Sequence, residues 1–579
     1  MENAPPTLEP SVKPAHVREI TPRSVIAALV VAAVIGASYP YVVLKLGFGP
    51  NISVVSAFFG FLALGLFSKT YNRWENNIVQ TAGTAAGQIA FLCWLLAAFD
   101  LLARDESTGF QVHLSTWQTF LWFSTAGILG VFLAVPLRKH FIEDEKLAFP
   151  DGLAAAETLI LLDSRGPQAK RSAYSMLGAL AASALVMWGT TRAWFEELIH
   201  VHLNRFSGVT GVGFSLSLLN IGSGMIIGLR ICSSMMVGLV LSWVVAPVLL
   251  ADNGVIAEGA KKVDVLLWVM WPATGMLVAG GLTALVLKWK TLVATFRSLS
   301  GASVQSGDFP LRWVIGGSLV SSAALVAIQY FVLGTPVWQS VLAIVLSIPL
   351  MLVAMRVLGE TNWGPISTMT NVMQAMFGGI TPGDMRATVV SSGITGSVAA
   401  ESEGLMQDYK TGHVIGSTPR MLTWMQLAAV PVGCLSLAFA YPLPRVTYGL
   451  GEGGLPSPIS VRWVGFAKIL SKGFSEIHPS AIWAIAIGAA VGVLFTVLEQ
   501  KKSLRAFVPS PTGIGIGMLV PASAVATMFL GACLDWIWRK SDSTSAQRYS
   551  IPVASGFIAG EALVAVIIPV LVAIGLMKL

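Results

Sequence analysis

Charge is what this sequence lacks most. Of its 579 residues only 12% are Asp, Glu, Lys or Arg, while 54% are hydrophobic. A soluble domain carries about 25% charged residues, so the polar surface that a water-soluble body needs is missing here. The charges stand in clusters between long apolar stretches, many of which reach the roughly 20 residues that a helix needs to span a bilayer. The composition therefore predicts an all-α polytopic membrane protein in contact with lipid.

Cysteine and histidine are also scarce, with four and seven residues in the whole chain. The cysteines lie singly within apolar runs, which is typical of small buried side chains rather than of disulfides or metal ligands. The sequence contains no HExxH motif, no GxxxxGK[ST] phosphate-binding loop and no serine nucleophile beside a partnered histidine. These absences argue against an enzyme, a metal site, a bound cofactor and ATP-driven transport.

The formal net charge of +7 could suggest a nucleic-acid partner. The basic residues form no continuous face, however, and stand in short loops between apolar runs, where the positive-inside rule places them. Lys13, Arg18 and Arg23 precede the first span, and Arg138 and Lys139 follow the fourth. Counting alternate crossings puts these groups on one side. We therefore expect a cytoplasmic N-terminus and no nucleic-acid binding.

The apolar runs predict about sixteen membrane segments, some of them short or broken, after a polar tail at residues 1–23 that we expect to be disordered. The shorter runs at 150–163 and 365–380 are typical of re-entrant or broken helices, which are tolerated where they line protein or a cavity. The stretch 442–477 is rich in Gly and Pro and is predicted to be an irregular loop. Clear spans are expected near 24–46, 51–68, 76–103, 116–137, 174–198, 213–229, 231–251, 266–289, 311–333, 337–358, 387–404, 420–441, 478–499, 510–538 and 551–577.

An internal repeat is visible. Residues 221–243 align without gaps with residues 514–536, and the aligned pairs include identical Ile, Gly, Met, Leu and Trp residues. Two shorter landmarks recur in the same order, Glu75-Asn-Asn77 with Glu360-Thr-Asn362, and Asp144-Glu-Lys146 with Asp408-Tyr-Lys410. The pattern predicts two parallel repeats, 24–297 and 298–579, of the kind found in transporters.

Amides and hydroxyls within the spans are the candidates for binding a solute. Gln80, Thr84 and Gln88 recur at helical spacing and so share one face of the third span. That face either lines a cavity that binds substrate by hydrogen bonds or joins helices through interhelical hydrogen bonds. The candidate substrate-binding residues are Asn77, Gln80, Thr81, Gln88, Asn220, Asn362, Ser392 and Thr395.

Carboxylates at membrane depth are the candidates for proton coupling. An ionisable group at the centre of a spanning helix costs about 3 kcal/mol on insertion scales, so its presence suggests a function. The candidates are Glu75, Glu360, Glu401, Glu403 and Glu561. The alternative for each is a structural ion pair, for instance of Glu403 with Lys410.

Seven short stretches occur in the order Trp74-Glu-Asn-Asn-Ile-Val-Gln-Thr81, Asp144-Glu-Lys-Leu-Ala-Phe-Pro150, Gly222-Ser-Gly-Met225, Gly359-Glu-Thr-Asn362, Leu405-Met-Gln-Asp-Tyr-Lys-Thr-Gly412, Ser417-Thr-Pro-Arg420 and Ala554-Ser-Gly-Phe-Ile-Ala-Gly560. In this order they resemble the oligopeptide transporter family, in its yellow-stripe-like branch. The resemblance implies proton-coupled uptake of small peptides or metal chelates, about sixteen helices and no tightly held cofactor. It is compatible with a homodimer and, given the short loops, with a bacterial-type member in the inner membrane.

The function that these features favour is secondary active transport, with protons as the coupling ion. A passive channel would need a ring-like filter of repeated pore motifs, and a membrane-embedded enzyme would need a convergent nucleophile or metal site. The candidate side chains are amides, hydroxyls and a few carboxylates, which suit a solute that carries its own charges. We therefore expect a peptide-like zwitterion or a chelate rather than a bare transition-metal ion, which needs His, Cys or clustered carboxylates.

Overall fold

The structure is a computed structural model. The predicted repeat boundary at 297/298 and residues 1–12 of the predicted tail lie outside the described residues. The structure describes residues 13–14, 16–46, 52–67, 71–105, 109–163, 167–287, 308–450, 455, 457–471, 478–501, 504 and 507–573.

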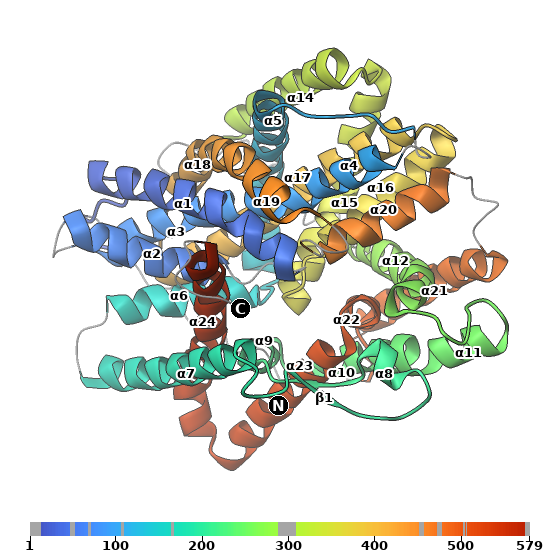
Figure 1. Ribbon diagram of the computed structural model, residues 1–579. Helices are drawn as coiled ribbons and strands as arrows, with labels where there is room; N and C mark the ends of the chain where they lie inside the picture. Colours follow the sequence, from blue (N-terminus) through green and yellow to red (C-terminus); the bar gives the residue numbers. More distant parts are fainter. Residues whose placement is uncertain are drawn as a thin grey trace.

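Helices form nearly all of the described chain, and the prediction of an all-α polytopic membrane protein is confirmed (Figure 1). Within those residues nine helices are long and apolar enough to span a membrane. The first part of the chain contains α1 (Pro22–Leu46), α2 (Ile52–Phe67), α3 (Arg73–Phe91), α4 (Cys93–Arg104), α5 (Thr116–Ala134), α6 (Pro150–Leu162), α7 (Pro167–Thr191), α8 (Ser207–Thr210), α9 (Leu218–Ile227), α10 (Leu229–Leu239), α11 (Ala246–Asp252) and α12 (Lys262–Leu287). The second part contains α14 (Leu311–Leu333), α15 (Val337–Thr361), α16 (Ile366–Ile380), α17 (Met385–Ile415), α18 (Pro419–Ala440), α19 (Pro442–Tyr448), α20 (Pro458–Ser471), α21 (Pro479–Glu499), α22 (Pro511–Leu519), α23 (Ala522–Ser541) and α24 (Ser543–Ala573).

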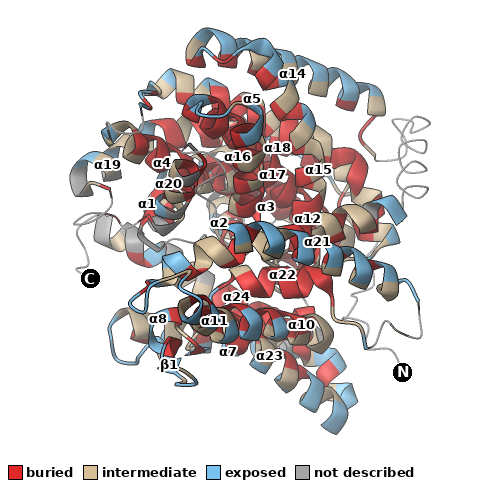
Figure 2. Ribbon diagram, turned by 90° about the vertical axis from the view of Figure 1, so that its right-hand side faces the viewer, coloured by how far each residue is buried: buried red, intermediate tan, exposed pale blue. Residues whose placement is uncertain are grey.

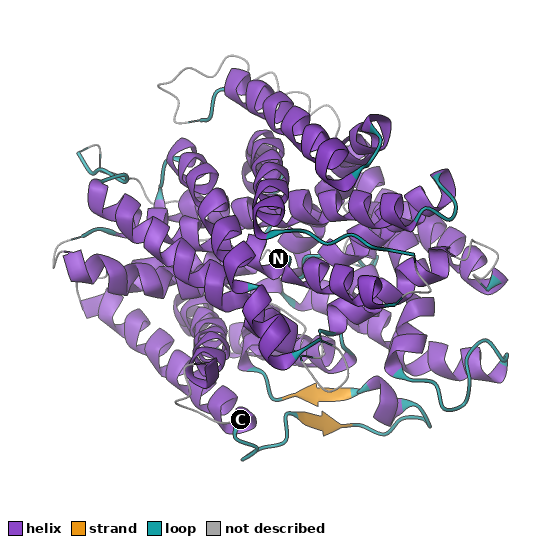
Figure 3. Ribbon diagram, turned by 45° about the horizontal axis from the view of Figure 1, so that its top comes forward, coloured by secondary structure: helices purple, strands orange, loops and turns teal. Residues whose placement is uncertain are grey.

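One small β-ribbon interrupts this pattern. Strand β1 (Leu198–His200) pairs antiparallel with β2 (Gly213–Ser215), and the two lie in the connection between α7 and α9 (Figure 3). The ribbon has only three residues in each strand.

Helices α3 and α17 are buried along nearly their whole length near the centre of the bundle (Figure 2). The sequence of α17 is rich in Gly, Ala, Ser and Thr, and such small side chains let neighbouring helices approach closely. Helix α3 starts with a capping box formed by Asn72 and Glu75. Helix α17 starts at the capping side chain of Asp384 and ends at Gly416, whose positive φ closes the last turn. Polar residues on these two helices are therefore held in the protein interior.

Two of the predicted spans are broken helices. The span predicted at 76–103 divides into α3 and α4 at Leu92, and the span at 510–538 divides into α22 and α23 at Val520 and Pro521. A third break separates α9 from α10 at Gly228, which has a φ of 88°. Backbone groups freed by such breaks are tolerated at membrane depth only within protein or beside a cavity.

The two segments that align in sequence cross each other through reciprocal contacts. Helix α9 packs on α23, and α10 packs on α22. A Cβ on Gly224 would overlap the carbonyl oxygen of Met528, and a Cβ on the aligned Gly517 would overlap the carbonyl oxygen of Met235. Each contact therefore has its counterpart at the position that the alignment requires, so the structure supports the match between 221–243 and 514–536.

The shorter landmarks do not correspond in the same way. Glu75 lies in the first turn of α3, whereas Glu360 lies in the last turn of α15. Asp144 ends the π-helical turn η3 (Lys139–Asp144), whereas Asp408 lies within α17. The predicted equivalence of these landmarks is wrong, because equivalent residues of two repeats lie at the same place in their respective helices.

The prediction of an irregular loop at 442–477 is also wrong in part. This stretch contains α19 and the 14-residue helix α20. The indole of Trp463 on α20 meets Trp94 edge to face at 5.9 Å and stacks on Phe99 at 6.4 Å. Aromatic packing of this kind adds to the free energy of burial, and it holds α20 against α4 although the flanking sequence is rich in Gly and Pro.

A short connection between η3 and α6 fastens several helices together. Phe149, with a φ of 42°, is fully buried and donates its backbone N–H to the carbonyl of Gly359 on α15 at 3.0 Å. Lys410 on α17 donates its Nζ to the carbonyl of Leu147 at 2.8 Å. Arg356 on α15 pairs with Glu145 of the same connection. We refer to residues 144–150 as the connecting clamp.

Part of the predicted tail lies against the helices. Glu19 is 3% exposed and accepts hydrogen bonds from the backbone N–H and the hydroxyl of Thr418, at the start of α18. Lys13 pairs with the same carboxylate.

Candidate functional site

A buried carboxylate lies where α3, α17 and α18 meet. Oδ1 of Asp408 accepts a hydrogen bond from Nε2 of Gln80 at 2.5 Å. Its Oδ2 accepts from the hydroxyl of Thr81 at 2.6 Å and from Nε2 of Gln426 at 2.5 Å. All four side chains are buried, with Asp408 0% exposed. Three donors from two neighbouring helices thus converge on one acceptor in α17, and we call these four residues the Asp408 cluster.

Further amides and hydroxyls extend this cluster along α3. Asn77 donates its Nδ2 to Oε1 of Gln80 at 2.7 Å and accepts from the hydroxyl of Ser417 at 2.7 Å. Thr84 accepts from Nε2 of Gln80 at 3.0 Å and contacts Ser53 of α2 at 3.2 Å. The chain of hydrogen bonds leads from the end of α17 into the centre of the bundle. The network therefore joins α2, α3, α17 and α18 through buried polar side chains.

Two more carboxylates on α17 are buried without comparable partners. Both oxygens of Glu401 and Oε1 of Glu403 have no hydrogen-bond partner among the described side chains. Glu401 packs against Gly127 and Gly130 of α5, and Glu403 lies against Gly364 in the turn between α15 and α16. An isolated ionised carboxylate is very costly in such an environment unless it binds a proton or a cation. Glu401 and Glu403 are therefore expected to hold a proton where they lie.

Glu401 and Asp408 lie seven residues apart, which is two turns, and so share one side of α17. The alternative that the sequence left open, an ion pair of Glu403 with Lys410, does not occur among the described residues, and Lys410 donates instead to the carbonyl of Leu147. One helix therefore carries three buried carboxylates, only one of which has a set of hydrogen-bond donors.

The structure brings some of the predicted substrate-binding residues together. Asn77, Gln80 and Thr81 belong to or adjoin the Asp408 cluster. Gln88 lies two turns further along α3, against Gly404 of α17.

The other predicted substrate-binding residues lie elsewhere. The amide of Asn362 exchanges hydrogen bonds with Asp151 at the start of α6. Asn220 bonds to residues just before α9, Thr395 contacts Ser347 of α15 at 2.8 Å, and Ser392 bonds to a carbonyl of its own helix.

Three of the predicted proton-coupling residues have structural partners. Glu75 caps α3 and forms a bidentate pair with Arg23. Glu360 pairs with Arg356 one turn earlier on α15. Glu561 accepts from the backbone N–H of Leu219 at 2.9 Å and so fixes the start of α9. Carboxylates with such partners typically stabilise the ends of helices and the contacts between them.

Replacing Glu75 with Gln is expected to lower stability without changing how uptake depends on pH. The substitution replaces the charged pair with Arg23 by a neutral contact, while Gln can still complete the capping box with Asn72. A hydrogen bond to a charged group contributes about 1.5–3 kcal/mol. Thermal unfolding in detergent and uptake at several pH values would measure the two effects. A changed pH profile at unchanged stability would instead make Glu75 a coupling residue.

Sequence reasoning missed Asp408 and Gln426. The predicted span ended at residue 404, before the polar residues of 407–410, although α17 continues to Ile415. The signal that could have revealed Asp408 is its helical spacing from Glu401. Gln426 is a single amide in an otherwise apolar span, and only its place in the bundle shows its partner. Among the described residues no three His, Cys, Asp or Glu side chains gather as metal ligands.

Comparisons with known proteins cover nearly the whole chain. A family model described as "OPT oligopeptide transporter protein" matches residues 19–572. A candidate oligopeptide transporter of Saccharomyces cerevisiae is 24% identical over 96% of this chain and 96% of its own length. A candidate oligopeptide transporter of Haemophilus influenzae is 24% identical over 92% of each chain. A metal-nicotianamine transporter of Oryza sativa is 24% identical over 94% of this chain and 91% of its own.

Proposed function

Since this chain belongs to the oligopeptide transporter family, we propose that it is a secondary active transporter that couples proton movement to the uptake of small peptides or metal chelates. The family consists of transporters rather than enzymes. The substrate classes are those in the names of its relatives, which include oligopeptides and metal–nicotianamine chelates. We place the protein in the inner membrane of a bacterium, with its N-terminus in the cytoplasm.

The observation that carries the proton-coupling proposal is the row of buried carboxylates on α17. Both oxygens of Glu401 and Oε1 of Glu403 are buried without a hydrogen-bond donor, while Asp408 accepts from three donors of α3 and α18. Protonation of Asp408 would weaken its hold on the amides of Gln80 and Gln426. These amides would then be released to bind the carboxylate or carbonyl groups of a solute, so that proton binding and solute binding depend on each other.

The test is uptake into proteoliposomes with an imposed pH gradient, using trialanine and the iron(II)–nicotianamine chelate as probes. We expect a gradient that is acidic outside to drive accumulation of at least one probe. Glu401→Gln and Glu403→Gln keep the shape of each side chain but cannot release a proton, so both variants should reduce the dependence of uptake on the gradient.

The matched control is Glu561→Gln, which replaces a buried carboxylate that anchors α9. This variant should retain gradient-driven uptake. Uptake by the unsubstituted protein that ignores the gradient would remove proton coupling, and gradient dependence that survives both α17 substitutions would place coupling elsewhere. Flux that never accumulates a probe above its outside concentration would favour the alternative of a passive channel.

A further inference from the structure

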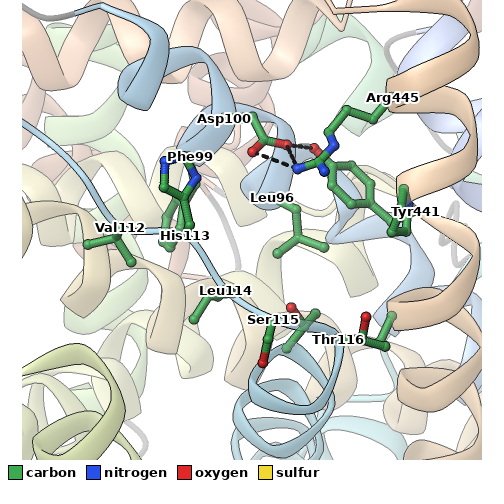
Figure 4. A pocket seen from close by; sticks show the side chains of 13 residues that line it. Leu96, Phe99, Asp100, Val112, His113, Leu114, Ser115, Thr116, Tyr441 and Arg445 are labelled. Carbon is green, nitrogen blue, oxygen red and sulfur yellow. Dashed lines mark hydrogen bonds and ion pairs between the residues drawn. The ribbon is translucent and has the colours of Figure 1, made fainter.

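A cavity of about 310 Å³ opens at the end of the bundle opposite to Glu75 (Figure 4). Helices α3 and α4 run from Arg73 to Arg104, and at 1.5 Å per residue the path from Glu75 to Asp100 covers roughly 38 Å. Helix α18 likewise starts beside Glu19 and ends at the cavity. If the N-terminus is cytoplasmic, the cavity therefore faces the outside.

One wall of this cavity carries a pair of opposite charges. Asp100 at the end of α4 accepts a hydrogen bond from the phenol of Tyr441 at 2.6 Å and pairs with Nη1 of Arg445 at 3.1 Å. Burial, together with the charge of Asp100, raises the pKa of the Tyr441 phenol, which keeps it a hydrogen-bond donor. Tyr441 thereby fixes the Asp100 carboxylate at the wall of the cavity.

Both charges remain within reach of a solute. The side chain of Arg445 is 38% exposed and that of Asp100 is 14% exposed. Arg445 uses one of its two Nη atoms for Asp100, and a guanidinium has five N–H donors, so it can also receive a carboxylate.

The opposite wall is formed by the extended segment that leads into α5, with Val112 and Leu114 as apolar contacts and His113 exposed between them. Leu96 and Phe99 of α4 add further apolar surface. Ligand pockets of small molecules measure about 300–1,000 Å³ and combine apolar walls with a few placed polar groups. This cavity combines apolar walls with a few polar groups in the same way, and its volume lies at the lower end of that range.

We propose that this cavity is an outer binding site for a zwitterionic solute, whose carboxylate binds Arg445 and whose ammonium group binds Asp100. The proposal rests on the proposed transport function, because a peptide or an amino-acid chelator carries both groups. The apolar walls accommodate side chains or the backbone of the chelator without selecting among them. The site would therefore collect solutes by their terminal charges before they reach the Asp408 cluster.

The test is protection of the thiol of His113→Cys from a charged maleimide, in purified full-length protein that also carries Cys533→Ser. Trialanine and the iron(II)–nicotianamine chelate are the two probes, and N-acetyl-trialanine amide is the uncharged control. We expect at least one zwitterionic probe to slow labelling several-fold and the blocked peptide to have no effect. The two probes distinguish a free peptide from a chelate as the preferred source of these charges.

Asp100→Asn and Arg445→Gln should each remove this protection, and should raise the KM of uptake while leaving its dependence on the pH gradient unchanged. The matched control is Lys468→Gln, which breaks the pair with Asp105 near the same end of α4 but outside the cavity. Protection should persist in this variant. A monodisperse elution profile is required of every variant.

The proposal is overturned if no probe protects the thiol, if the blocked peptide protects as well as trialanine, or if Lys468→Gln acts like Asp100→Asn. Proton-driven uptake without protection would remove the outer site alone. Protection without proton-driven uptake would remove the coupling proposal alone.

Discussion

Replacing Asp408 with asparagine is expected to reduce gradient-driven uptake to the level of empty liposomes. The amide cannot bind and release a proton, and its Nδ2 must face one of the donors that converge on Asp408 from Gln80, Thr81 and Gln426. A buried donor left without an acceptor costs about 1–3 kcal/mol, so the variant should also unfold at a lower temperature. Proteoliposome uptake of the probe that the unsubstituted protein accumulates would measure the loss.

The control for this substitution is Asp535→Asn. Asp535 is also buried, at 6% exposure, but it lies on α23, where it accepts from Ser550 and pairs with Arg539. Its replacement should cost stability and leave uptake measurable. If Asp408→Asn retains accumulation while Asp535→Asn does not, the assignment of coupling to Asp408 is wrong.

Replacing Gly224 with valine is expected to prevent the bundle from assembling. At this position α9 crosses α23 with the backbone of Met528 in direct contact, and even a Cβ would overlap a carbonyl oxygen there. Adding side-chain atoms to a packed core typically costs about 1–3 kcal/mol, and a rigid backbone neighbour places this substitution at or above the upper end. The yield of monodisperse protein after detergent extraction would measure the effect.

Gly517→Val should behave in the same way, because Gly517 makes the reciprocal contact with Met235. Gly316 provides the control, since it is exposed on α14 and a Cβ there meets no atom within 4 Å. Gly316→Val should be extracted like the unsubstituted protein. Normal yields of Gly224→Val with reduced yields of Gly517→Val would contradict the equivalence of the two crossings.

The sequence was sufficient to predict the helical membrane class and the position of most spans, because an apolar run of about 20 residues with few charges is typical of a helix that crosses a bilayer. It was insufficient for α17, whose second half is polar. Asp408 and Lys410 are buried there because α3, α18 and the connecting clamp supply their partners. Hydropathy within a single span cannot register partners that lie on other helices.

The same limit accounts for the broken helices and α20. Leu92 interrupts an apolar run without any Gly or Pro, so the division of α3 from α4 has no local signal. Conversely, the Gly and Pro residues of 449–458 suggested a loop, while the apolar face of α20 is recognisable only once Trp94 and Phe99 are seen to receive Trp463. The sequence correctly placed Gln80 and Thr84 on one face of α3. It could not show that Gln80 donates to Asp408 on another helix.

The connecting clamp has a mechanical consequence. It ties α15 to α17 through Phe149, Lys410 and Arg356, so these helices should move as one rigid body. Transporters alternate access by rocking one such body against another. We then expect α15 and α17 to move relative to α3 and α18. The interface between them is the side of α17 on which Asp408 accepts its three hydrogen bonds. Protonation of Asp408 would weaken those hydrogen bonds, so the coupling proton would also allow the two groups of helices to move against each other.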